Sequence, residues 1–273
     1  MKVRVAHLSD PHFGTVKPEI KQALLNAMKD LNPSLIVISG DISQRATYSQ
    51  FREARAFTKS LAGLPLIAIP GNHDIPLFNL IARLFYPYAG FRSVFKGILQ
   101  RRLMVNGVQV LALNSTSRFR HIQGDLVISK LKKHLSEMSN EALIRIVTFH
   151  HPMACPKHVD VKNLLKGREQ VMKILEEKKI DLILGGHIHD PHVALSTEHY
   201  KDVKRAAIFS VAGTCLSWRT RADAPNSFHL IDIETENSSR LEIIRYDVDQ
   251  NFRFQPVGSQ KFTKDTEAGW QRA

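Results

Sequence analysis

The stretch SLIVISGD, residues 34–41, decides the fold. Its apolar and mostly β-branched residues predict a buried strand, and this strand runs directly into Gly40 and Asp41. A strand that is predicted to lie in the core therefore ends in a carboxylate. Because ligands of open α/β sheets bind just outside the carboxyl ends of the strands, Asp41 is a candidate site residue.

Four other apolar runs end in polar side chains in the same way, and each is closed by Gly or Pro. The residues that follow these runs are Asp10 and His12; Asn72, His73 and Asp74; His150 and His151; and His187 and His189. Any one such pair is a weak signal, whereas five sets at successive strand ends are a strong one. Since the carboxyl ends of parallel strands meet at one edge, we expect all five sets to share one rim.

Segments with apolar residues at helical spacing alternate with these strands, and they cover residues 18–31, 47–61, 128–138 and 162–179. After His189 the pattern changes to successive strands with short turns: VALSTE, AAIFSVAG, SFHLIDIE and RLEIIRYDV. These strands predict a second, more antiparallel sheet. The fold class is therefore α/β, as a four-layer α/β/β/α sandwich with two mixed β-sheets and a site at the C-terminal strand ends.

The chain shows no linker rich enough in Pro, Gly or Ser to divide it into two domains. We expect one domain over residues 1–249, with a helical insert at about residues 75–100. Residues 250–273 are polar and lack a hydrophobic period, so they predict a C-terminal tail that lies on the surface or is partly mobile.

With 273 residues, 43% of them hydrophobic, the chain can bury a substantial core, which excludes global disorder. Cys155 and Cys215 are too few for a disulfide framework or a thiolate metal site. The start MKVRVAHLSD is too short and too polar for a signal peptide, and no apolar run is long enough to span a bilayer. We therefore expect a cytoplasmic protein.

The net charge of +12 favours anionic partners, namely nucleic acid, phosphorylated metabolites or an acidic membrane surface. The charge is spread along the chain, however, and the cluster KLKKHL lies on a predicted helix, where it forms a solvated face. The sequence shows no interleaving of aromatic and basic residues of the kind that stacks nucleic-acid bases. A nucleic-acid partner is thus the least favoured of the three.

Seven strand-end residues are candidate metal ligands: Asp10, His12, Asp41, Asn72, His150, His187 and His189. Carboxylate, amide and imidazole ligands without sulfur suit Mn, Fe, Zn or Co. Seven ligands exceed what one ion needs, and a carboxylate can bridge two divalent metal ions. Asp41, alone at its strand end, is the candidate bridge. His151 remains an alternative to His150 as the ligand.

The ordered motifs D-x-H, G-D, G-N-H-D, H-H-P and G-H-x-H resemble the calcineurin-like metallophosphoesterase family, from residue 2 to about residue 213. The resemblance implies the four-layer sandwich, a dinuclear metal centre, and phosphoester hydrolysis by a metal-bridging hydroxide. It also implies His73, paired with Asp74, as the catalytic histidine. The resemblance assigns Asp10, His12, Asp41 and His189 to one ion, and Asp41, Asn72, His150 and His187 to the other.

The segment LNSTSRFRHIQGDLVISKLKKHL, residues 113–135, resembles more narrowly the cyclic-nucleotide phosphodiesterase branch of the family. The matching residues are Asn114, Ser115, Gly124, Leu131 and Leu135. The resemblance implies a metal-dependent phosphoric ester hydrolase that acts on a small phosphodiester, with a cyclic nucleotide as the leading candidate.

The insert IPLFNLIARLFYPYAGF, residues 75–91, motivates an alternative function. Its five aromatic residues and Arg83 follow the G-N-H-D motif directly, so the insert can receive an acyl chain. The alternative is a pyrophosphatase of the UDP-diacylglucosamine type, which acts on a lipid-linked nucleotide at the membrane surface. We expect the aromatic residues to pack into a compact lid, with a lipid groove or a subunit interface as alternatives. A nucleic-acid-acting phosphoesterase is the third function considered.

Overall fold

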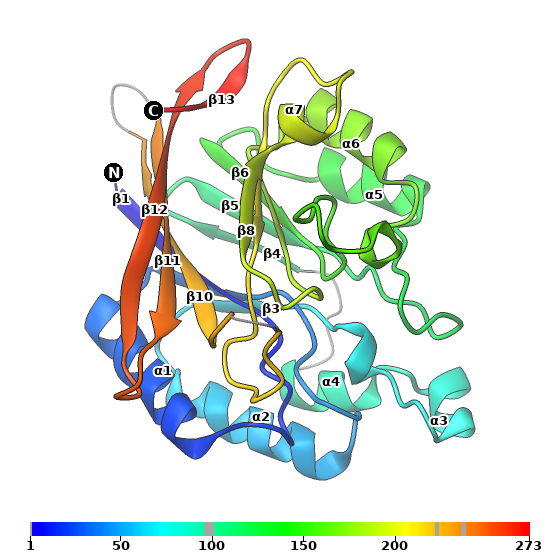
Figure 1. Cartoon of the computed structure of the whole chain (residues 1–273). Coiled ribbons are helices and arrows are strands. Elements are labelled where there is room, and N and C mark those ends of the chain that lie inside the picture. Colours follow the sequence, from blue (N-terminus) through cyan, green and yellow to red (C-terminus); the bar gives the residue numbers. More distant parts are fainter. Residues whose placement is uncertain (1, 96–100, 222–223, 236–238) are drawn as a thin grey trace.

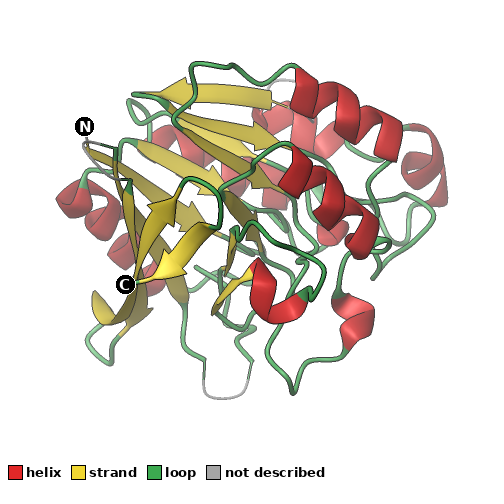
Figure 2. Ribbon diagram, turned by 90° about the horizontal axis from the view of Figure 1, so that it is seen from above, coloured by secondary structure: helices red, strands yellow, loops and turns green. Residues whose placement is uncertain are grey.

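The chain folds into two β-sheets that pack face to face, with helices on the outer faces of both (Figure 1). The structure is a computed structural model and describes residues 2–95, 101–221, 224–235 and 239–273. Seen from above, the strands lie between the two groups of helices (Figure 2). The predicted α/β class and its sandwich of two mixed sheets are confirmed.

The first sheet has seven strands in the order β13-β12-β11-β10-β1-β2-β3. Strands β1 to β3 are parallel, and the other four continue the sheet in antiparallel fashion. The bounds are β1 Lys2–Leu8, β2 Leu35–Ile38, β3 Leu66–Ala68, β10 Ser227–Glu234, β11 Arg240–Val248, β12 Phe254–Asp265 and β13 Gly269–Arg272.

The second sheet has six strands in the order β4-β5-β6-β7-β9-β8. Strands β5, β6, β7 and β9 are parallel, and the edge strands β4 and β8 are antiparallel to their neighbours. The bounds are β4 Arg101–Val105, β5 Val108–Ala112, β6 Ile144–Thr148, β7 Leu182–Gly185, β8 His192–Leu195 and β9 Ile208–Val211.

The alternation of side chains along the strands builds two cores. Val5 and Val37 face the second sheet, whereas Ala6 and Ile36 face the helices α1 (Pro18–Leu31) and α2 (Tyr48–Ser60). Both faces of the strands are therefore buried, which explains their nearly continuous apolar sequence. On the other side, α5 (Ile128–Ser136) and α6 (Arg168–Glu177) cover the second sheet.

The predicted helix over residues 162–179 begins later than expected. Residues Val161–Asn163 form only a short 3₁₀ turn, and α6 starts at Arg168 after Gly167. Gly167 has a left-handed backbone with φ of 67°, which glycine adopts without strain. The residues before it form a loop, although their apolar spacing is compatible with a helix.

The strands after His189 do not form a sheet of their own, so this prediction was wrong. Strands β8 and β9 extend the sheet of β5 to β7, whereas β10 and β11 join β1. In addition, the end of the predicted strand VALSTE forms the short helix α7 (Ser196–His199). A strand pattern indicates burial but does not specify which edge the strand joins, and here the chain crosses between the sheets.

The predicted C-terminal tail is also wrong, because residues 254–272 supply β12 and β13 of the first sheet. Phe254 and Phe262 are the buried residues of β12, and most of its other side chains are exposed. Trp270 of β13 is fully buried, and its indole N–H donates to Asp181 at 3.1 Å. Strand β12 pairs with β13 only over residues 262–265, and a long strand with one solvated face has a polar sequence, which hides its period.

The insert contains helices α3 (Leu80–Phe85) and α4 (Ala89–Phe95), and its last predicted residues, 96–100, lie outside the described residues. Phe91 and Phe95 of α4 are buried beside α2. In contrast, α3 has no buried residue and projects at the periphery (Figure 1). The expected compact lid is therefore wrong for α3, whose aromatic side chains face solvent.

Among the described residues, the chain has no helix with the length and apolarity needed to cross a membrane.

Candidate metal centre

Five of the seven candidate ligands have a left-handed backbone, which non-glycine residues seldom adopt. The φ values are 49° for Asp10, 46° for His12, 48° for Asp41, 70° for His187 and 57° for His189. Each such residue costs about 1–3 kcal/mol, and such residues gather at functional sites where the surrounding structure holds them. Here the turned backbone follows the ends of β1, β2 and β7 and brings the side chains to one rim.

Backbone contacts between the loops hold this geometry. The amide of Asp10 donates to the carbonyl of Gly40 at 3.1 Å, and the amide of His12 donates to the carbonyl of Asp41 at 3.0 Å. Two glycines of the motifs permit close approach, because a Cβ at Gly71 would overlap the Asp41 carboxylate and a Cβ at Gly186 would overlap Asp10. The loops after four strands are therefore locked together.

The structure brings the candidate ligands into two groups that share one carboxylate. In each group, the ligand atoms lie within 4.8 Å of one another. Asp41 Oδ2 is 3.6 Å from Nε2 of His12 and 3.4 Å from Nε2 of His150, so one oxygen faces both groups. The groups are Asp10, His12, Asp41 and His189, and Asp41, His150 and His187. Asn72 joins the second group, since its Oδ1 lies 3.1 Å from His150 Nε2.

The hydrogen bonds of the imidazoles turn their Nε2 atoms into the cluster. Nδ1 of His150 donates to the carbonyl of Ser39 at 2.8 Å, and Nδ1 of His189 donates to the carbonyl of Arg219 at 3.0 Å. Such outer partners fix the tautomer of metal-binding histidines. When these rings are neutral, Nε2 carries a lone pair that faces the oxygen atoms of carboxylate and amide side chains. These lone pairs repel one another, and a cation between them would remove the repulsion.

Three buried atoms of the cluster residues, Oδ1 of Asp10, Nδ1 of His12 and Nε2 of His187, make no hydrogen bond within the described part of the chain. Buried polar groups are normally satisfied, so such atoms need an explanation. The donor set of oxygen and imidazole nitrogen, without thiolate, fits a borderline divalent ion. The residues present therefore fit a metal centre.

The charges of the cluster are strongly coupled. Burial acts to raise the pKa of Asp10, but His189 and His12 outweigh it and hold this pKa well below its usual value. Burial acts to lower the pKa of His150, but the Asp41 carboxylate outweighs it and raises the pKa to about 9. Burial lowers the pKa of His187 to about 3, so this ring is neutral and can serve as a metal ligand. The cluster thus holds anionic oxygens beside the protonated His150 ring, whose proton a bound metal ion would displace.

His73 lies beside the cluster, but its predicted pairing with Asp74 is wrong. Nδ1 of His73 lies 2.9 Å from the carbonyl of Gln44, and its ring centroid is 4.9 Å from that of His12. The Asp74 carboxylate accepts instead from the amides of Ile42, Ser43 and Gly71 and from the Ser43 hydroxyl, at 2.7–3.0 Å. The hydrogen bonds of Asp74 connect the loops that carry Asp41 and His73, whereas the His73 ring itself bonds to Gln44.

His150 and His151 point in different directions. The ring of His150 faces Asp41, whereas Nδ1 of His151 lies 2.9 Å from Ser115 Oγ. Gly124 packs against the His151 ring so closely that a Cβ there would overlap it. Ser115 and Gly124 of the 113–135 segment thus support His151 behind the cluster, and Leu131 and Leu135 belong to the core.

Sequence reasoning missed three residues at this rim. The His121 ring centroid is 5.5 Å from that of His73, and Nδ1 of His121 has no hydrogen-bond partner in the described residues. Gln44 contacts His73 through its carbonyl, and its side chain accepts from Arg219 at 2.9 Å. None of the three follows an apolar strand run, and therefore no sequence pattern marked them.

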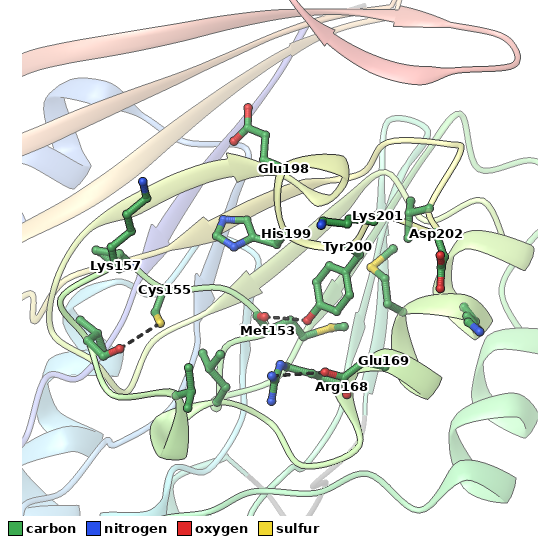
Figure 3. Close-up of a pocket in the computed structure, with 17 residues that line it drawn as sticks. Met153, Cys155, Lys157, Arg168, Glu169, Glu198, His199, Tyr200, Lys201 and Asp202 are labelled. Carbon is green, nitrogen blue, oxygen red and sulfur yellow. Dashed lines mark hydrogen bonds and ion pairs between the residues drawn. The ribbon is translucent and has the colours of Figure 1, made fainter.

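A separate pocket of about 470 Å³ lies between the loop after β6, α6 and α7 (Figure 3). The Tyr200 hydroxyl donates to the carbonyl of Met153 at 2.7 Å across it. None of the seven candidate ligands lines this pocket, and neither does His73. It is distinct from the metal centre.

Comparisons with known proteins show the family to which the chain belongs. Residues 3–191 match the model of the calcineurin-like phosphoesterase family. The chain is 27% identical over 209 residues to a probable cyclic nucleotide phosphodiesterase of Synechococcus sp., which covers 71% of this chain and 76% of that protein. It is 26% identical over 201 residues to a probable glycerophosphodiester phosphodiesterase of Arcobacter nitrofigilis, with 68% and 71% covered.

A solved structure supports the fold. The purple acid phosphatase of yellow lupin seeds superposes with a TM-score of 0.70 at 13% identity, over 97% of this chain. The match spans about half of the lupin chain, 54%, so it bears on the fold alone. With the family model matching more than half of its residues, and with the buried Asp/His cluster at the strand ends, the chain belongs to the calcineurin-like phosphoesterase family and is a metal-dependent phosphoester hydrolase.

Proposed function

We propose that the chain hydrolyses small phosphodiesters at the rim formed by the two ligand groups, with two divalent ions of the Mn, Fe, Zn or Co class. The observation that carries the proposal is the position of Asp41 Oδ2, which faces His12 on one side and His150 on the other. A carboxylate in this position can bind two ions at the spacing of about 3.5–4 Å that is typical of two-metal sites. The ions supply positive charge that activates water and offsets the charge of the phosphate oxygens.

The ligand roles follow the two groups. Asp10, His12 and His189 would hold one ion, Asn72, His150 and His187 would hold the other, and Asp41 would serve both. The carbonyls of Ser39 and Arg219 keep two of the imidazoles turned inward.

His73 acts on the substrate rather than on an ion. Its Nδ1–H donates to the carbonyl of Gln44, which leaves Nε2 available for the phosphate or the leaving oxygen. When the ring is doubly protonated, the Gln44 carbonyl stabilises the imidazolium by accepting from Nδ1–H. Nε2 then donates its proton to the leaving alkoxide, and the ring becomes neutral. Asp74 contributes by fixing the backbone on both sides of the site.

The leading substrate is a cyclic nucleotide or another small diester. Two relatives carry the names cyclic nucleotide phosphodiesterase and glycerophosphodiester phosphodiesterase, and both substrates are diesters of small molecules. The exposed aromatic residues of α3 favour, as a second candidate, a lipid-linked nucleotide pyrophosphate at a membrane surface. No observation supports a nucleic-acid substrate.

The proposal is tested on purified protein loaded with Mn²⁺. Hydrolysis is measured for 3′,5′-cyclic AMP, glycerophosphocholine, bis(p-nitrophenyl) phosphate, p-nitrophenyl phosphate and an acylated UDP-sugar. We expect the diesters to be hydrolysed in preference to the monoester, with one P–O bond broken by water per turnover to give a phosphomonoester; the linear diesters release one alcohol or phenol, whereas the ring of cyclic AMP opens. Turnover of the acylated UDP-sugar without any hydrolysis of the small diesters would replace the leading substrate by the second candidate.

A further inference from the structure

A patch of large apolar side chains is exposed on α3 and on the loop after β5. Phe78, Ile81 and Phe85 are 80%, 71% and 70% exposed, and Phe119 is 74% exposed. Leu80 and Tyr86 complete this α3 patch with comparable exposure. Contiguous exposed apolar surface of this kind marks an interaction site, whereas scattered apolar residues do not.

The two segments of the patch are held together by hydrogen bonds. The Arg83 guanidinium donates to the carbonyl of Arg120 at 3.4 Å, and the Arg118 guanidinium donates to the carbonyl of Leu84. The Tyr88 hydroxyl lies 3.0 Å from Thr116 Oγ1. The patch is therefore one surface built from two parts of the chain.

The charge around the patch is of one sign. The two segments that build it, residues 78–86 and 116–120, contain three arginines and no Asp or Glu. The Arg45 guanidinium lies 5.5 Å from the ring centroid of Phe78, and that of Arg118 lies 5.0 Å from the ring centroid of Phe119. In the described chain, Arg45, Arg83 and Arg118 form no salt bridge with a carboxylate; Arg120 alone of these neighbours pairs with one, Asp125 at 2.7 Å.

The patch adjoins the metal centre. Phe78 follows the G-N-H-D motif by four residues, and His121, two residues after the patch residue Phe119 in the loop, lies beside His73. A partner bound to the patch therefore lies next to the rim where phosphodiesters are hydrolysed.

Apolar side chains among unpaired arginines fit the interface of an anionic bilayer. Aromatic and aliphatic side chains enter the boundary of headgroups and acyl chains, while arginines contact lipid phosphates. A second copy of the chain fits less well, because a two-fold interface places the same patch, with its arginines, on both sides. Like charges would then face each other without carboxylates to offset them.

We propose that the α3 patch docks the protein on an anionic bilayer surface, with Ile81, Phe85 and Phe119 in the headgroup region and Arg45, Arg83 and Arg118 against lipid phosphates. Docking goes beyond the proposed hydrolysis and does not depend on it. It holds the metal centre at the membrane surface.

The test is co-sedimentation of the purified full chain with vesicles of phosphatidylcholine and phosphatidylglycerol, and with vesicles of phosphatidylcholine alone. We expect binding to the anionic vesicles, and weaker binding at about 0.5 M salt, because salt screens exposed charges. The variant Ile81→Ser, Phe85→Ser should bind at least about tenfold more weakly, since two apolar side chains no longer enter the interface. Arg118→Ser should weaken binding about fivefold.

The matched control is Phe252→Ser, Val257→Ser, which removes two exposed apolar side chains at the β11–β12 end, away from α3 (Figure 1). This control should bind like the unchanged protein. Circular dichroism and thermal unfolding check that every variant folds. Absence of vesicle binding by the unchanged protein, or equal binding by both double variants, overturns the proposal. Self-association that the α3 variant abolishes, without vesicle binding, assigns the patch to a second copy instead.

Discussion

The metal-centre rim and the α3 patch are neighbours, and both depart from the usual rule that polar side chains are exposed and apolar side chains are buried. At the rim, Asp10, His12, Asp41 and His150 are buried, although they are polar. On α3, Ile81 and Phe85 are exposed, although they are apolar. A buried polar cluster and an exposed apolar surface both carry a cost that folding alone does not explain. The difference therefore marks two sites, one for ions and one for a partner.

The largest expected effect tests the rim. Asp41→Asn removes the one carboxylate that faces both ligand groups, so both ions should be lost together. We expect activity to fall by at least about 10⁴-fold, because the ions contribute several kcal/mol to the transition state. Metal content by elemental analysis and diester hydrolysis measure the two effects.

The control for this change is Asp232→Asn, which alters a carboxylate that pairs with Arg4 away from the cluster. It should keep both metals and full activity. Two metals per chain in Asp41→Asn would contradict the shared role of this carboxylate.

His73→Ala tests the substrate side of the rim. The variant should keep both metals and lose about 10²–10⁴-fold in rate, as expected for loss of a general acid. The loss should shrink for bis(p-nitrophenyl) phosphate, whose leaving group needs no proton. His134→Ala, on the outer surface of α5, serves as the control. A loss of metal in His73→Ala would instead make this residue a ligand.

The rim could be predicted from the sequence because each ligand follows a buried strand within one or a few residues. Asp41 after SLIVIS and His187 after DLILGG mark the strand ends directly, and the sheet brings them together. The partner of His73 could not be predicted, since Gln44 contributes a backbone carbonyl that no side-chain motif encodes. Asp74 was misassigned because proximity in sequence does not fix the direction of a side chain.

The sequence also could not predict which sheet each late strand joins, or that the apolar side chains of α3 are exposed. The strand patterns of β9 and β10 indicate burial, but the sheet that each joins depends on contacts between distant segments. Aromatic residues such as Phe85 predict packing, and nothing in the helix-length period shows that α3 buries none of its side chains against the described part of the chain.

A third prediction concerns a chain of hydrogen-bonded polar side chains that leads from the rim into the core between the two sheets. Ser9 bonds to Asp10, Ser39 to Ser9 at 2.8 Å, and His7 to Ser39 at 2.9 Å. The chain of contacts continues between the sheets through Ser210 to His229. Burial lowers the pKa of His229 to about 3, and it also lowers the pKa of His7. Both rings are therefore neutral in the folded protein.

Acid should destabilise the metal-free protein through these rings. Because their folded pKa lies below the unfolded value of about 6.5, the unfolded state binds more protons as pH falls. Stability should therefore fall below about pH 6.5, with about 2–3 kcal/mol lost at pH 4.5 through His229. Urea unfolding at several pH values measures the slope, and His229→Gln should flatten it. An unchanged slope in that variant would exclude His229 as its source.

The smallest expected effect separates the two halves of the insert. Phe85 of α3 is largely exposed, so Phe85→Ala removes few contacts and should change the free energy of unfolding by no more than about 0.5 kcal/mol. Phe91 of α4 is fully buried against Phe95, with ring centroids 4.7 Å apart, so Phe91→Ala should cost about 3–5 kcal/mol. Urea unfolding of both variants makes the comparison directly. If Phe85→Ala were as destabilising as Phe91→Ala, α3 would pack on the chain in solution, and its side chains would no longer be free to meet a membrane.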